Sequence, residues 1–91
     1  METESTSAKM KIGVLYVDDE INNLTSFKAT FRSSFKIFTA ISGEEGRKIL
    51  ETHSSEIHII ITDQRMPGMT GVEFLCSIIK DYPDQIRILL T

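Results

Sequence analysis

The chain has 91 residues, enough for one small domain with a single core and too few for a second one within this sequence. Hydrophobic residues make up 41% and charged residues 25%, a composition that excludes disordered, collagen-like and coiled-coil chains. Ten basic and thirteen acidic residues give a net charge of −3, which leaves no broad basic surface for nucleic acid or anionic lipid.

The first ten residues are mostly polar and lack the apolar stretch of a signal peptide. We therefore predict that residues 1–10 form a disordered tail. No apolar run approaches the ~20 residues that a membrane span needs, so the chain is not expected to enter a bilayer. Cys76 is the only cysteine and can form no disulfide within the chain, which fits a cytoplasmic protein.

Strands and helices are predicted to alternate from residue 11 onward. The apolar run 11–17 indicates a buried strand that ends at a group of acids, and apolar residues at helical spacing predict a helix over 21–33. Residues 36–40 alternate as a short strand does. Ser42 and Glu45 then have capping-box spacing, which predicts the start of a second helix.

The second half of the sequence continues this alternation. The isoleucine-rich run 56–62 indicates a central strand buried on both faces. After a loop with Pro and Gly, Thr70 and Glu73 repeat the capping-box spacing before a third helix, and 86–90 is a fourth apolar strand. The inner stripe of the third helix is expected to consist of Val72, Leu75, Cys76 and Ile79. Strands joined by helices predict a parallel α/β sheet with helices on both faces.

Acidic residues follow two of the predicted strands. Asp18 and Asp19 come after 11–17, and Asp63 comes after 56–62. Ligands of an open parallel sheet bind beyond the carboxyl ends of its strands, so the three carboxylates are expected to meet in one crevice. They repel one another unless a cation neutralises them, and oxygen-only donors favour Mg²⁺. The competing interpretation is that Asp18 and Asp63 cap helices and Asp19 is simply solvated.

Three motifs resemble the receiver domain of bacterial two-component response regulators: VLYVDDE (14–20), IIITDQRMPGMTGVEFL (59–75) and ILLT (88–91). They place an acid pair after the first strand, a D-x-x-M-P-x-x-x-G stretch after the third and a threonine after the fourth. This combination is specific, and the similarity covers nearly all of 11–91. The resemblance implies a flavodoxin-like fold and a phosphorylation-controlled signalling switch.

The resemblance also implies a role for each site residue. Asp63 is the phosphoacceptor, which takes a phosphoryl group from a sensor histidine kinase. Asp18 and Asp19 hold Mg²⁺ directly or through water, and the backbone carbonyl of Arg65 completes the protein ligands. The cation would neutralise the attacking carboxylate and the phosphoryl group, and the Thr91 hydroxyl would then move to donate to a phosphoryl oxygen.

The receiver domains that this chain resembles are longer and have five strands. Residues 11–91 are therefore expected to be a partial receiver domain, truncated after its fourth strand and lacking the final helix, strand and helix. The lysine that ends the fifth strand is among the missing parts. The apolar strand 86–90 would then be an exposed edge, which predicts self-association of the chain.

Two other functions stay open at this stage. A pseudo-receiver would use the fold as a protein-interaction module without phosphorylation, which the missing lysine favours and the intact acids oppose. A Mg²⁺-dependent phosphohydrolase would use Asp63 as its nucleophile, but such enzymes usually carry a second acid two residues later, where Arg65 stands. We expect a signalling domain, not an enzyme, in which His53 and His58 have structural or solvated roles and Cys76 is a small core residue.

Overall fold

The structure is a computed structural model that describes residues 11–91, so the tail predicted over residues 1–10 lies outside the described residues. In chain order the elements are β1 (Gly13–Val17), α2 (Ile21–Phe31), β2 (Lys36–Ala40), α3 (Gly43–His53), the 3₁₀ turn η1 (Ser54–Glu56), β3 (Ile59–Asp63), α4 (Gly71–Ile78) and β4 (Ile86–Leu90). Within this part of the chain, no helix is long and apolar enough to span a bilayer.

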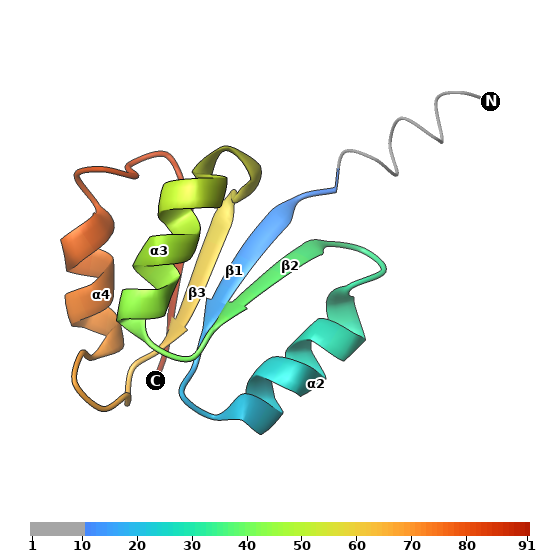
Figure 1. Cartoon of the computed structure of the whole chain (residues 1–91), viewed down its shortest axis with the longest axis horizontal. Helices are drawn as coiled ribbons and strands as arrows, with labels where there is room; N and C mark the ends of the chain where they lie inside the picture. Colours follow the sequence, from blue (N-terminus) through green and yellow to red (C-terminus); the bar gives the residue numbers. More distant parts are fainter. Residues whose placement is uncertain (1–10) are drawn as a thin grey trace.

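The strands form one parallel sheet in the order β2-β1-β3-β4. The sheet lies between α3 and α4 on one side and α2 on the other (Figure 1). The predicted fold class, a flavodoxin-like parallel sheet with helices on both faces, is confirmed. Because β1 and β3 are neighbours in the sheet, the residues that follow them meet at one edge.

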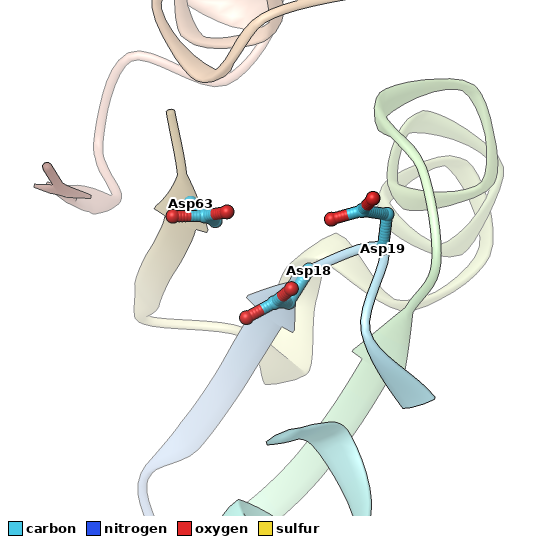
Figure 2. A group of neighbouring side chains, drawn as sticks. All are labelled: Asp18, Asp19 and Asp63. Carbon is cyan, nitrogen blue, oxygen red and sulfur yellow. The ribbon is translucent and has the colours of Figure 1, made fainter. Parts of the chain in front are cut away.

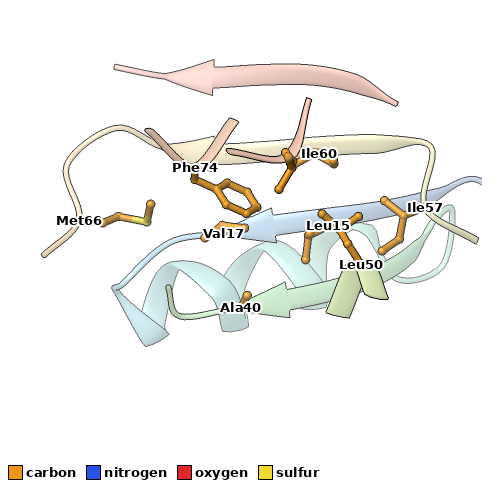
Figure 3. Close-up of a cluster of buried hydrophobic side chains, with 9 residues drawn as sticks. Leu15, Val17, Ala40, Leu50, Ile57, Ile60, Met66 and Phe74 are labelled. Atoms are coloured by element: carbon orange, nitrogen blue, oxygen red, sulfur yellow. The ribbon is translucent and has the colours of Figure 1, made fainter. Parts of the chain in front are cut away.

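The main core fills the space between the sheet and the two helices α3 and α4. Leu15, Ile60 and Phe74 have no exposed surface and lie together there (Figure 3). Gly46 lies inside α3, and a Cβ atom at this position would be 3.0 Å from the ring of Phe74. A glycine in the helix interior costs about 1 kcal/mol relative to alanine, and here it makes room for the largest core side chain.

The opposite face of the sheet is covered by α2 alone within the described residues. Leu24 of this helix is buried against the sheet, and Phe27 of the same helix packs on Tyr16 with their ring centroids 4.6 Å apart. Beside α2 the sheet carries a shallow apolar groove of about 200 Å³, lined by Val14, Phe27, Phe31, Phe35, Ile59, Ile61 and Ile88. On β4, the side chains of Ile86, Ile88 and Leu90 are exposed.

The predicted inner stripe of α4 is wrong. Val72, Cys76 and Ile79 are exposed and Leu75 is half-buried, whereas Gly71, Phe74 and Ile78 are buried. A Cβ atom at Gly71 would lie 2.4 Å from the carbonyl oxygen of Asp63, so the helix begins in direct backbone contact with the end of β3. This contact turns Phe74 and Ile78 inward, because they lie on the same side of the helix as Gly71.

The boundaries of three other elements differ from the prediction. The strand predicted over 11–17 begins at Gly13. The strand predicted over 56–62 begins only at Ile59, because Glu56 belongs to η1, where its carboxylate contacts Lys36 and His53. The helix predicted over 21–33 ends at Phe31.

Candidate functional site

Three carboxylates meet at the carboxyl edge of the sheet. Asp18 and Asp19 follow β1, and Asp63 is the last residue of β3. Each offers one oxygen that lies within 4.8 Å of the others (Figure 2). Asp18 is buried, Asp63 is half-buried and Asp19 is exposed. The structure thus brings Asp63 to Asp18 and Asp19, which lie more than forty positions earlier in the sequence, at the edge of the sheet where the carboxyl ends of the strands were expected to bring them together.

Asp18 is held by hydrogen bonds from three donors. Its Oδ1 accepts from the Glu20 backbone N–H at 2.9 Å, and its Oδ2 accepts from the Tyr16 hydroxyl at 2.7 Å and the Asn23 side-chain amide at 3.1 Å. Burial alone would raise the pKa of Asp18, but these hydrogen bonds outweigh it and hold the pKa below its ordinary value. Asp18 is therefore stabilised in its charged form.

Tyr16 is the buried partner of this carboxylate. Burial raises the pKa of Tyr16 above its ordinary range, and the hydrogen bond to Asp18 and the charges of Asp18 and Asp63 raise it further. Its hydroxyl therefore stays a neutral donor. The sequence analysis missed Tyr16 and Asn23 as site residues. The available signal was the alternation of a strand, which places residues 16 and 18 on the same face.

The interpretation of Asp18 and Asp63 as helix caps does not match the observed helix starts. The N-cap of α2 is Glu20, which makes no side-chain capping bond. The N-cap of α4 is Thr70, which forms a complete capping box with Glu73, as the spacing of these two residues predicted. Neither Asp18 nor Asp63 is the N-cap of the helix that follows it.

Arg65 and Thr91 lie near the acids without a contact that defines their roles. Arg65 is exposed in the loop two residues after Asp63. Thr91 is exposed and follows Leu90, the residue of β4 that pairs with Asp63. Both positions are at the carboxyl edge of the sheet, and their assignment as a metal ligand and a switch hydroxyl stays a prediction.

The donor set fits a hard divalent cation. Mg²⁺ prefers oxygen ligands at about 2.1 Å, so two ligands on opposite sides of the ion are about 4.2 Å apart. One carboxylate oxygen from each of Asp18, Asp19 and Asp63 lies within 4.8 Å of the others, and together they could hold Mg²⁺ with water as the remaining ligands.

The other polar clusters in the described residues lie away from this edge and support the structural roles predicted for the histidines. His53 Nδ1 lies 2.9 Å from Glu56 Oε2, and its ring packs on Phe38. His58 Nδ1 accepts a hydrogen bond from the Gly13 N–H at 3.0 Å. Cys76, predicted to be a core residue, is exposed instead.

Comparison with known proteins gives a consistent result. A model of the response regulator receiver domain family matches residues 14–91. The hydrogenase transcriptional regulatory protein HoxA of Cupriavidus necator is 37% identical over 78 residues, which cover 86% of this chain and 16% of that protein. The chain therefore spans only a small part of this curated relative.

Solved structures show the same similarity. A response regulator receiver domain protein from Clostridium thermocellum superimposes with a TM-score of 0.83 at 32% identity, over 88% of this chain and 64% of that one. A CheX-CheY-BeF₃-Mg²⁺ complex from Borrelia burgdorferi matches with a TM-score of 0.77 at 29% identity, over 86% of this chain and 60% of that one.

Proposed function

The chain belongs to the response regulator receiver domain family, and on this premise we propose that it is a signalling domain that accepts a phosphoryl group on Asp63. The observation that carries the proposal is the position of the Asp63 carboxylate, within 4.8 Å of those of Asp18 and Asp19 at an open edge of the sheet. We propose Asp18, Asp19 and the Arg65 backbone carbonyl as the ligands that hold Mg²⁺ beside it.

The proposed step is transfer of a phosphoryl group from a phosphohistidine to Asp63. A carboxylate oxygen of Asp63 forms a bond to phosphorus while the bond between phosphorus and the histidine nitrogen breaks, and the histidine leaves with the electron pair of that bond. A bound Mg²⁺ would offset the negative charge that gathers when a phosphoryl group approaches three carboxylates. Asp63 is half-buried, so part of this residue stays accessible to an incoming donor.

The receiver family is a regulatory signalling module, and its partners define the wider proposal. We propose a sensor histidine kinase in the cytoplasm as the phosphodonor, and an output domain or downstream protein as the reader of the modified state. Residues 11–91 form the receiver part in this proposal, and residues 1–10 an extension outside it. The hydroxyl of Thr91 would donate to the new phosphoryl oxygens, which add nearly two negative charges to this edge.

The test is chemical phosphorylation of the chain by a small phosphoramidate donor, followed by intact-mass measurement. We expect a gain of one phosphoryl group in the presence of Mg²⁺ and no gain with EDTA. Asp63→Asn should remove the gain, whereas Asp81→Asn, which changes an exposed aspartate between α4 and β4, should retain it. A folded chain that gains no phosphoryl group under these conditions contradicts the proposal.

A further inference from the structure

We infer that Tyr16 and Asn23 are positioning residues that orient the Asp18 carboxylate and thereby set the affinity and selectivity of the site for Mg²⁺. Both act through Asp18. The inference rests on the proposed function, because it concerns the same acidic site.

The position of the Tyr16 ring is held by packing that does not involve Asp18. Its side chain is 7% exposed, and its ring packs on Phe27 with the centroids 4.6 Å apart. Residues 16 and 18 lie on the same face of β1, and the hydroxyl donates to Asp18 Oδ2 over 2.7 Å. A donor bonded to a charged acceptor at this distance forms one of the stronger hydrogen bonds in proteins. Rotation of the Asp18 carboxylate would break this bond.

Asn23 adds a second restraint from a different element. It lies in the first turn of α2, and its amide donates to the same oxygen, Asp18 Oδ2, over 3.1 Å. The backbone N–H of Glu20 occupies Oδ1. Asp18 is thus held from β1, from the following loop and from α2. Within residues 11–91, no group donates to the carboxylates of Asp19 and Asp63 in the way that three donors hold Asp18, and each of them offers one oxygen as a possible ligand.

The restraint matters because the three carboxylates repel one another in the absence of a cation. A freely rotating Asp18 would turn away from Asp19 and Asp63, and cation binding would have to return it against that repulsion. The hydrogen-bond donors on Asp18 hold it in place, so part of the free energy needed to bring the three carboxylates together is already supplied before the cation binds. Groups that orient a metal ligand in this way typically contribute 10- to 100-fold to metal affinity, a range of about 1.4 to 2.7 kcal/mol.

The same restraint favours Mg²⁺ over Ca²⁺. Mg²⁺ demands near-ideal geometry at short distances, whereas Ca²⁺ accepts longer and more variable bonds. A released Asp18 carboxylate could retreat to suit the larger ion. Removal of the Tyr16 hydroxyl should therefore weaken Mg²⁺ binding more than Ca²⁺ binding, which a general loss of fold would not do.

The experiment is calorimetric titration of the 91-residue chain with Mg²⁺ and, separately, with Ca²⁺. We expect Tyr16→Phe to weaken Mg²⁺ binding by about 10-fold and Ca²⁺ binding by less, and Asn23→Ala to act in the same direction with a smaller effect. The matched controls are Tyr82→Phe and Asn22→Ala. Tyr82 lies outside the acidic site, and Asn22 is the exposed neighbour of Asn23. Both should bind as the unmodified chain does.

The outcomes separate this inference from the proposed function. If the unmodified chain binds no Mg²⁺, both are overturned. If it binds Mg²⁺ and the Tyr16→Phe chain binds it equally well, only the positioning role is overturned. An equal loss of Mg²⁺ and Ca²⁺ affinity would also overturn it, because that result indicates general destabilisation. Should Tyr16→Phe fail to fold, the exposed Asn23→Ala change decides the question by the same comparison of the two ions.

Discussion

The two faces of the sheet are packed very differently. On the face toward α3 and α4, the side chains of Leu15 and Ile60 are completely buried. On the face toward α2, the apolar side chains of β4 are open, with Ile86 61% exposed and Ile88 40% exposed. The same central strands contribute to both faces, because neighbouring residues of a strand point to opposite sides.

The two faces therefore differ in what they contribute: the closed face to the stability of the fold, and the open face to the acidic site. The closed face contains most of the fully buried side chains, and we expect it to supply most of the free energy of unfolding. The open face carries Tyr16 and, at its edge, Asp18, which share that side of β1. Changes on the closed face should therefore act on folding, and changes on the open face on cation binding and association.

The largest expected effect is on the closed face. Phe74→Ala removes a fully buried ring and should lower the free energy of unfolding by about 3 to 5 kcal/mol. Phe31→Ala is the matched change on the open face, where the ring is already 39% exposed, and it should cost clearly less. Urea unfolding followed by circular dichroism measures both. Equal losses would contradict the division between the faces.

The next effect concerns association through β4. This strand is one of the two edge strands of the sheet within residues 11–91, and the backbone groups of Arg87 and Leu89 face outward because those of Ile86 and Leu90 bond to the β3 side. We predict that the 91-residue chain self-associates at micromolar concentration and that Ile88→Lys shifts it toward monomer. Val72→Lys, at a similarly exposed apolar residue of α4, should leave association unchanged. Sedimentation velocity tests this, and a monodisperse unmodified monomer would refute it.

A smaller effect is expected at acid pH, in the presence of EDTA. The pKa of Asp18 is lower in the folded protein than its ordinary value of 3.8, so its contribution to stability is complete above that value. The contribution disappears as the pH falls from there through the folded pKa. Asp18→Asn should flatten the dependence of unfolding free energy on pH in that range. Parallel curves for the two chains would show that Asp18 is not the group responsible.

The smallest effect belongs to an ion pair on the surface of the closed face. Arg47 of α3 lies 3.4 Å from Asp81, and the two side chains are 36% and 63% exposed. Exposed pairs typically contribute about 0.2 to 1 kcal/mol, so Asp81→Ala should change the free energy of unfolding by no more than that. The difference should shrink at high salt. If Asp81→Ala lowered the free energy of unfolding as much as Phe74→Ala, charge and not packing would be what holds α3 and the segment after α4 together.

The α4 helix shows where reasoning from the sequence was incomplete. Apolar residues occur on more than one side of this helix, so helical spacing alone could not decide which side faces the sheet. The close contact between Gly71 and the carbonyl of Asp63 decides it and selects Phe74 and Ile78. Likewise, the sequence pattern did not show that Glu56 lies in η1 and pairs with Lys36, a residue twenty positions earlier, with β3 beginning only after it.

The sequence by itself determined the order of strands and helices, the parallel α/β class and the three acids that end up together. These follow from local physics: the periodicity of apolar residues, the capping of helix starts and the direction of parallel strands. Only the tertiary structure decided that α4 turns Phe74 inward and that Tyr16 and Asn23 hold Asp18. Each of these depends on distances and packing in three dimensions, which the periodicity of a sequence does not contain.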